Sequence, residues 1–125
     1  MSRFVRLSTY LSTLPRPETY RQAAAMLLSV IRDAQVPFGA HDYSGGGSTD
    51  VWDPKWMSLV DLTNRTFYFN AAMSPNLVWA SLENFDMAEG APVLVLDPRN
   101  PILVGDVTTA FRPVAELGKL FGPQR

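Results

Sequence analysis

The stretch WMSLVDLTNRTFYF, residues 56–69, decides the fold of this chain. Each half alternates between two sets of side chains, as a β-strand does, so the stretch predicts a hairpin. The polar residues Thr63-Asn64-Arg65 predict its turn, with Asn64 in the left-handed backbone that a short loop needs. Apolar residues occur on both faces of both arms, so we expect a sheet covered on each side. One face of the first arm carries Trp56, Ser58, Val60 and Leu62.

A long helix is predicted ahead of the hairpin, over residues 18–34. Its apolar side chains recur at three- and four-residue spacing. Glu18 suits the positive end of the helix dipole, and Pro37 and Gly39 end the helix. The hairpin is the large apolar partner for this helix, so we expect helix layered on sheet, an α+β fold. The apolar stripe of the helix comprises Tyr20, Ala24, Leu27, Leu28 and Ile31.

The segments on either side of this unit are predicted as follows. Residues 3–14 fit a helical stripe, although Thr9-Tyr10 also suits a strand, and Pro15-Arg16-Pro17 ends the element. Residues 41–54 form a glycine-rich surface loop, which lacks the helix start and Lys that a phosphate-binding loop requires. A third strand over 76–82 and a short one over 93–97 complete a mainly antiparallel meander, 56–97. The tail, 98–125, supplies a last strand and a short helix.

Composition excludes several classes of function. With 46% hydrophobic residues, the 125-residue chain can build a core, and a net charge of −1 gives no reason to expect nucleic acid or an anionic membrane as a partner. No apolar run approaches the ~20 residues of a membrane span, and no signal-peptide pattern is present. The chain has no cysteine, which neither requires nor excludes an oxidising compartment, so localisation stays open between cytoplasm and periplasm.

Two motifs carry a family resemblance. The hairpin reads Trp-x-x-x-x-Asp-Leu-x-Asn-Arg-x-x-Tyr-Phe, and a third strand and a Leu-x-x-Phe-Asp ending at Asp86 follow. Ahead of it, residues 2–6 read Ser-Arg-Phe-Val-Arg. Together and in this order, they resemble the C-terminal part of the linear amide C–N hydrolases of the choloylglycine hydrolase family, which includes penicillin V acylases and bile salt hydrolases. The similarity covers about residues 2–97.

The resemblance implies an N-terminal-nucleophile hydrolase, a four-layer αββα sandwich in which an N-terminal Cys attacks the amide. In typical members the Ser-Arg-Phe element comes well past the middle of the polypeptide, and here it begins at Ser2. We therefore expect residues 1–125 to be the C-terminal segment of a single domain, inactive alone. Its expected partners are the missing N-terminal portion or further copies, because family members are commonly homotetramers.

Arg3 is the candidate catalytic residue. The resemblance places the arginine of the Ser-Arg-Phe element in the active site beside the nucleophilic Cys. A guanidinium there favours the thiolate and can also bind a carboxylate or the substrate carbonyl. Arg6 is the second candidate, with a structural role favoured. No cofactor and no metal ion is expected. Pro54, where many members carry Thr, and the glycine-rich loop depart from the family and leave the substrate class in doubt.

Other functional interpretations are weaker than their structural alternatives. His41, Asp42 and Ser44 lie in one loop, whereas a catalytic triad draws on separated segments. One His without Cys does not predict a zinc site. Asp61 is expected to bind locally at its turn. Six aromatic residues offer an alternative reading as a binding platform, but strand periodicity favours core packing for most of them. These are Trp52, Trp56, Trp79, Phe67, Tyr68 and Phe69.

Two functional hypotheses remain open at this stage. In the first, the chain is part of an amide hydrolase, with a bile salt conjugate, penicillin V or an acyl-homoserine lactone as the substrate. In the second, it is a small non-catalytic α+β module that binds a ligand or partner through apolar surface.

Overall fold

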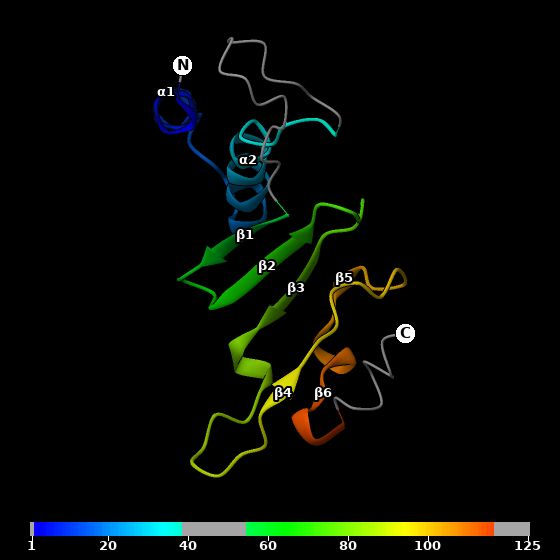
Figure 1. Cartoon of the computed structure of the whole chain (residues 1–125). Helices are drawn as coiled ribbons and strands as arrows, with labels where there is room; N and C mark the ends of the chain where they lie inside the picture. Colours follow the sequence, from blue (N-terminus) through cyan, green and yellow to red (C-terminus); the bar gives the residue numbers. More distant parts are fainter. Residues whose placement is uncertain (1, 39–54, 117–125) are drawn as a thin grey trace. The chain divides into compact units, whose positions relative to one another are not determined.

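The computed structural model describes residues 2–38 and 55–116 and confirms an α+β fold (Figure 1). The chain divides into two compact units, Met1–Leu59 and Val60–Arg125. The first contains two helices, α1 and α2, and the second contains most of the strands. In the part of the chain that the structure describes, neither helix is long and apolar enough to cross a membrane.

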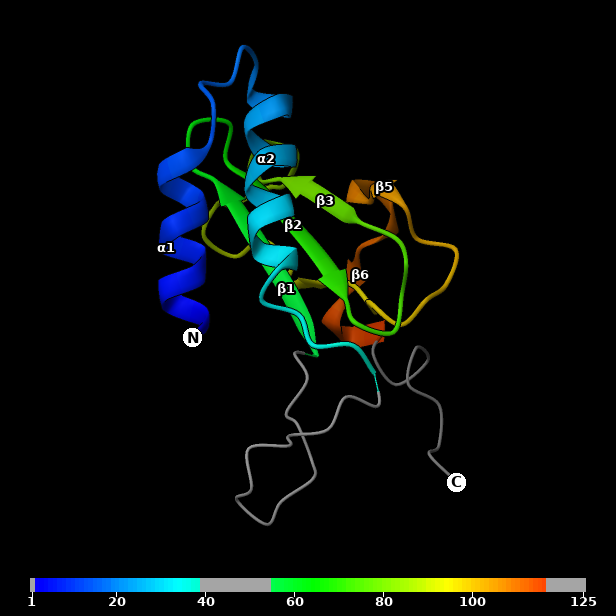
Figure 2. The ribbon, with the colours of Figure 1, turned by 90° about the horizontal axis from the view of Figure 1, so that it is seen from above.

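The two helices lie side by side and run in opposite directions (Figure 2). Helix α1 spans Arg3–Thr13, which decides between the helix and the strand left open above, and α2 spans Tyr20–Arg32, which confirms the long helix. Thr19 caps α2, its side chain accepting from the Gln22 amide at 3.1 Å, so the helix starts two residues later than predicted. That α2 lies on the sheet stays a prediction.

The apolar faces of the two helices differ in burial. In α2, Ala24, Leu28 and Val30 are buried. Helix α1 contains no buried residue, and its first large apolar side chain, Phe4, is 79% exposed. Proline and the residues around it end α1 after Thr13, as the sequence predicts. Phe4, Val5 and Leu11 of the apolar stripe of α1 are therefore exposed, whereas Leu7 is half-buried.

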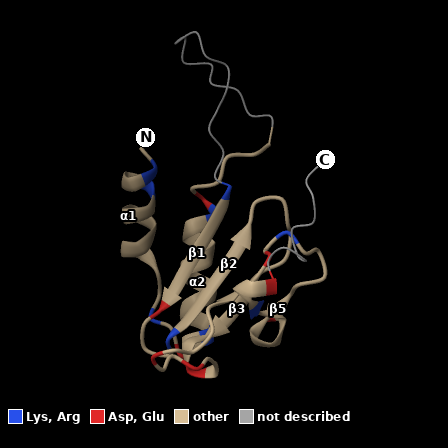
Figure 3. Ribbon diagram, turned by 60° about the horizontal axis from the view of Figure 1, so that its bottom comes forward, with Lys and Arg blue, Asp and Glu red and all other residues tan. Residues whose placement is uncertain are grey.

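The main sheet has four strands in the order β1-β2-β3-β5. They span Trp56–Asp61, Thr66–Ala71, Val78–Ser81 and Gly105–Asp106. Strands β2 and β3 are antiparallel, with Phe67 opposite Ala80 and Phe69 opposite Val78, whereas β3 and β5 are parallel. Figure 3 shows charged residues mostly at the ends of these elements, and β2 and β3 contain none.

The fourth strand of the meander was predicted wrongly. Strand β4, Leu94–Val95, does not join the main sheet but pairs with β6, Arg112–Pro113, in a separate two-stranded sheet. The place beside β3 belongs to β5, where Gly105 has a φ of 75° that favours glycine. The Gly105 amide donates to the Leu77 carbonyl at 2.9 Å, which fixes β5 against the start of β3.

The hairpin turn confirms one expectation and corrects another. The Asp61 carboxylate binds locally, accepting from the Thr63 and Asn64 amides at 3.0 Å each and from Asn64 Nδ2 at 2.6 Å. The left-handed residue is Arg65, with φ of 50°, and not Asn64. The left-handed backbone therefore occurs one residue later than predicted.

Strand β1 is covered on one face only, so the expectation of cover on both faces is wrong for this strand. Met57 is buried, whereas Trp56 is 61% exposed, and Val60 and Leu62 are exposed as well. The alternation itself is confirmed. Large apolar side chains therefore lie exposed on one face of this strand.

Candidate functional site

The Ser-Arg-Phe element forms the first turn of α1. Ser2 has an extended backbone, and its hydroxyl accepts from the Val5 amide at 3.3 Å. The Ser2 carbonyl accepts from the Arg6 amide at 3.2 Å. Ser2 is therefore the N-cap, and it fixes Arg3 as the first helical residue. The sequence motif and the start of the helix coincide.

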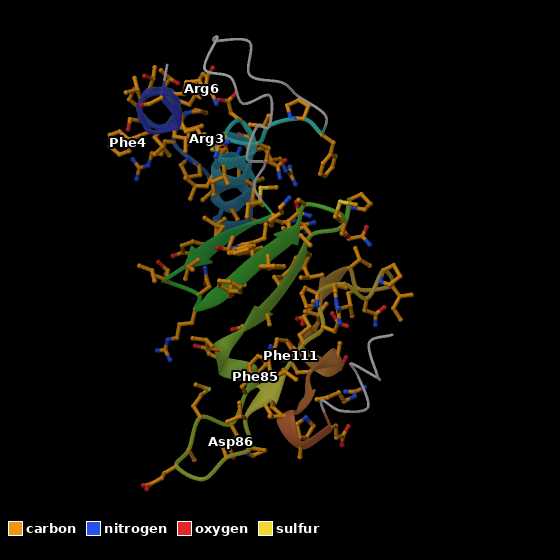
Figure 4. All side chains as sticks on the ribbon, viewed as in Figure 1. Arg3, Phe4, Arg6, Phe85, Asp86 and Phe111 are labelled. Carbon is orange, nitrogen blue, oxygen red and sulfur yellow. The ribbon has the colours of Figure 1, made fainter. Side chains whose placement is uncertain are left out.

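Arg3 is exposed and lies at an end of the helix that disfavours it. The N-terminus of a helix carries partial positive charge, so a cation there costs about 0.3–1 kcal/mol. The first turn of α1 contains no acidic residue. Figure 4 shows Arg3 and Arg6 projecting from one side of α1 and Phe4 from the other. Arg3 thus lies at the end of α1 where the helix dipole favours an anion.

Arg6 has a structural role, as expected from the sequence. Its Nε lies 3.0 Å from Asp33 Oδ2, and its Nη2 donates to the Asp33 carbonyl oxygen at 3.0 Å. Asp33 caps the C-terminus of α2. Arg6 thus joins the start of one helix to the end of the other, where the helix dipole favours a cation.

The carboxyl groups with shifted pKa values are ionised groups that accept hydrogen bonds within turns. They cannot serve as general acids. Hydrogen bonds from the Asn64 side chain and backbone lower the pKa of Asp61. The Arg99 guanidinium lowers the pKa of Asp97, and the Thr108 hydroxyl and amide lower that of Asp106. Each group is therefore ionised at neutral pH, so none can donate a proton there.

An apolar groove forms within the second unit. Its floor is one face of β2 and β3, where Phe67 lies opposite Ala80. Phe85, after β3, and Phe111, before β6, meet edge to face with ring centroids 4.9 Å apart (Figure 4). We call this the aromatic groove, defined by Phe67, Phe85 and Phe111, and its volume is about 480 Å³. A cavity of about 380 Å³, lined by Phe69 and Val78, adjoins it.

The aromatic groove is suited to binding rather than to chemistry. The rest of its lining is almost entirely apolar, and among its described residues Asp86 alone carries a charge. The Oδ1 atom of Asp86 accepts from the Ala88 amide at 3.0 Å, which holds the carboxylate at the rim. Apolar walls with one polar group are typical of a site that binds an apolar partner in a fixed orientation. The lining also includes Leu82, Met87, Ala91, Pro92, Val93 and Leu94.

The other candidate residues from the sequence differ in where they lie in the structure. His41, Asp42, Ser44 and Trp52 lie outside the described residues. Tyr68 and Trp79 are half-buried and in contact, with ring centroids 5.9 Å apart, which agrees with core packing. Trp56 and Phe67 are exposed, so core packing is wrong for these two. Within residues 2–38 and 55–116, no three potential metal-binding side chains cluster.

Sequence reasoning missed the aromatic groove. Its lining comes from residues 67 to 111, and residues far apart along the chain leave no periodic signal. Phe85 and Asp86 do belong to the quoted Leu-x-x-Phe-Asp ending. Phe111, whose ring contacts that of Phe85, lies in a stretch of sequence without a motif.

Comparison with known proteins identifies the family to which these sequence motifs belong. A model of the linear amide C–N hydrolases, choloylglycine hydrolase family, matches residues 1–102. The chain belongs to this family. The match includes both the element at residues 2–6 and the hairpin with its Leu-x-x-Phe-Asp ending, so the recognition from sequence motifs is confirmed.

Two acylases illustrate the relationship within the choloylglycine hydrolase family. A penicillin V acylase of Pectobacterium atrosepticum is 28% identical over 127 aligned residues, which cover 89% of this chain and 33% of the acylase. The structure of a penicillin V acylase from Agrobacterium tumefaciens superposes with a TM-score of 0.76 at 26% identity and covers 90% of this chain and 36% of that one. The fold is thus that of part of an N-terminal-nucleophile hydrolase, and the chain spans about a third of these relatives.

Proposed function

We propose that this chain contributes to a hydrolase that cleaves linear amide C–N bonds, of the penicillin V or conjugated bile salt type. The observation that carries the proposal is the family match over residues 1–102. The chain has no cysteine, so by itself it lacks the nucleophile of the family. We therefore assign the nucleophile to the N-terminal portion of the same fold, which corresponds to the two thirds of the relatives that this chain does not span.

In this proposal Arg3 faces the reacting cysteine. The thiolate attacks the amide carbonyl carbon, the amine leaves with a proton, and water then hydrolyses the thioester to the acid. A guanidinium near the sulfur stabilises the thiolate over the thiol. Two observations support this role: Arg3 is exposed at the very start of α1, and the helix dipole disfavours a cation there.

The uncovered apolar side chains of α1 support a partner next to Arg3. Phe4 follows Arg3 directly, and Val5 and Leu11 are exposed as well. Burying a large apolar side chain contributes about 1.5–3 kcal/mol, so a partner that covers this surface gains substantial stability. We propose that the N-terminal portion covers it and thereby brings the cysteine to Arg3.

Complementation between two polypeptides tests the proposal. The Pectobacterium acylase is expressed without the segment that aligns with this chain, and the purified chain is added to it. Its own segment, added in the same way, is the positive control. Hydrolysis of penicillin V and of a glycine-conjugated bile salt is measured. We expect the chain to restore hydrolysis of at least one substrate.

Variants of the chain then separate the two arginines. Arg3→Ala should abolish restored hydrolysis while the complex still forms, because binding and chemistry use different side chains. Arg6→Ala should weaken the helix pair and leave turnover per assembled complex unchanged. If the acylase's own segment restores activity and this chain assembles without doing so, the non-catalytic module is the better description.

A further inference from the structure

The aromatic groove is an apolar surface that the described part of the chain leaves open. Met87 and Val93 in its lining are 73% and 70% exposed, and Phe67 in its floor is 44% exposed. The strands that form the floor, β2 and β3, contain no charged residue. Apolar surface of this kind gains stability when an apolar partner covers it.

The groove belongs to the part of the chain that the larger relatives share. Its lining residues from Phe67 to Leu94 lie within the family match, residues 1–102. The Agrobacterium acylase superposes on 90% of this chain, whereas this chain covers 36% of that acylase. Most of that fold therefore consists of polypeptide that this chain does not span. Because the layers of a domain cover one another's apolar faces, that polypeptide is the expected cover of the groove.

Asp86 restricts the chemistry of the segment that covers the groove. It is the one charged residue among the described lining residues, and its Oδ1 atom accepts from the Ala88 amide at 3.0 Å. An ionised carboxylate has acceptor capacity for further donors. A wholly apolar cover would remove water from this carboxylate without replacing the lost hydrogen bonds, which is costly. The covering segment should therefore be apolar and carry one cation.

We propose that an apolar segment of the N-terminal portion of this fold occupies the aromatic groove, with one lysine or arginine side chain beside Asp86. This inference rests on the proposed function, which assigns the rest of the fold to that portion. It adds a docking surface within the second unit to the one on α1. Phe67, Phe85 and Phe111 then belong to the core of the assembled domain and do not form a pocket for a small ligand.

Thiol labelling tests the proposal because the chain has no cysteine of its own. Met87→Cys and Val93→Cys place single thiols in the groove, and Glu89→Cys places one at an exposed position of the same loop, outside the lining. Each variant is co-expressed with the Pectobacterium acylase that lacks the aligned segment. The rate of maleimide labelling is measured in the complex and in the chain alone. We expect labelling at positions 87 and 93 to be about ten-fold slower in the complex, and labelling at position 89 to be unchanged.

The outcomes separate this inference from the proposed function. Protection of positions 87 and 93 in a complex that hydrolyses no amide would support the docking surface and contradict the proposed function. Full labelling in a complex that does hydrolyse penicillin V would overturn this inference alone. Slow labelling in the chain alone would also overturn it, and a dependence on concentration would then identify a second copy as the occupant. Failure of the two polypeptides to associate would overturn both.

A change of charge at Asp86 provides the second measurement. Asp86→Asn keeps an oxygen atom for the Ala88 amide and removes the negative charge. It should weaken binding of the acylase portion about three-fold at low salt, and the difference should vanish at high salt because an ion pair is screened. Glu89→Gln removes a charge outside the groove and should bind as tightly as the parent in calorimetric titration. Equal affinity of Asp86→Asn and the parent at low salt would overturn the placement of a cation beside Asp86.

Discussion

The guanidinium of Arg6 and the carboxylate of Asp33 join the two helices of the first unit. Their Nε and Oδ2 atoms are 3.0 Å apart, and Nη2 also donates to the Asp33 carbonyl oxygen at 3.0 Å. Arg6 therefore satisfies the end of α2 twice, as a counter-ion and as a donor to a terminal carbonyl group. Arg3, three residues earlier, belongs to the same motif, and we propose a role for it beside the reacting cysteine. The two arginines can thus be separated by experiment.

Arg6→Ala should lower the free energy of unfolding by about 1 kcal/mol, the scale of a half-exposed ion pair with one added hydrogen bond. Arg6→Lys should lower the free energy of unfolding by less, because lysine keeps the positive charge and loses only the forked geometry of the guanidinium group. Urea unfolding followed by circular dichroism measures both. Arg16→Ala, an exposed arginine between the helices, is the matched control and should change stability by less than about 0.5 kcal/mol. An equal loss in the control would contradict a specific role for Arg6.

The predictable part of the fold is the part with local causes. The helical spacing over residues 18–34 gave α2 to within two residues, because an amphipathic period and caps are local signals. Strands β1, β2 and β3 follow from alternation in the same way. Strand β4 has two residues, too few for any period, and its pairing depends on β6 seventeen residues further on. Only tertiary contacts decide such a pairing.

The candidate site also has one part that local sequence predicts and one part that only tertiary contacts create. Arg3 was found through a motif of adjacent residues, and its place in the first turn of α1 follows from the Ser2 cap. The aromatic groove was missed because Phe85 and Phe111 are 26 residues apart and meet only in the folded chain. The exposure of Trp56 could not be predicted either, because alternation defines two faces of a strand without saying which one is covered.

Asp61 should make the stability of the hairpin depend on pH. Hydrogen bonds from the Asn64 side chain, the Asn64 amide and the Thr63 amide lower the pKa of its carboxyl group below the usual 3.8. A lowered folded-state pKa contributes stability that is present above the unfolded-state pKa of about 3.9 and is lost as pH falls through the folded value. Asp61→Asn should therefore have a lower urea midpoint than the parent at about pH 6, and the difference should shrink at about pH 2.5.

Asp97 and Asp106 also have lowered pKa values, so they too make stability depend on pH. Both residues are present in the parent and in Asp61→Asn. Their contribution cancels in the difference between the two midpoints. A difference that is the same at both pH values would show that the charge of Asp61 is irrelevant and that only its shape matters.

The purified chain should not hydrolyse penicillin V or a conjugated bile salt by itself. It has no cysteine, and loss of one member of a cooperative catalytic site already costs several orders of magnitude in turnover. Arg3 can stabilise a thiolate but cannot replace it. Release of the carboxylic acid, followed by liquid chromatography, measures this, with Arg3→Ala as the companion variant. Turnover by the chain alone that disappears in Arg3→Ala would overturn the assignment of the nucleophile to another portion.

The uncovered side of α1 should make the purified chain self-associate. Phe4 is 79% exposed, and no residue of α1 is buried. Each such side chain left in water forgoes about 1.5–3 kcal/mol, so contact between copies is favourable where the proposed N-terminal portion is absent. Light scattering should give a mass above 13.9 kDa that rises with concentration. Phe4→Glu should lower this mass, whereas Ser12→Glu, at an exposed polar position of α1, should not. A monomer with one sharp melting transition in calorimetry would instead show that the chain needs no cover, and would favour the small binding module.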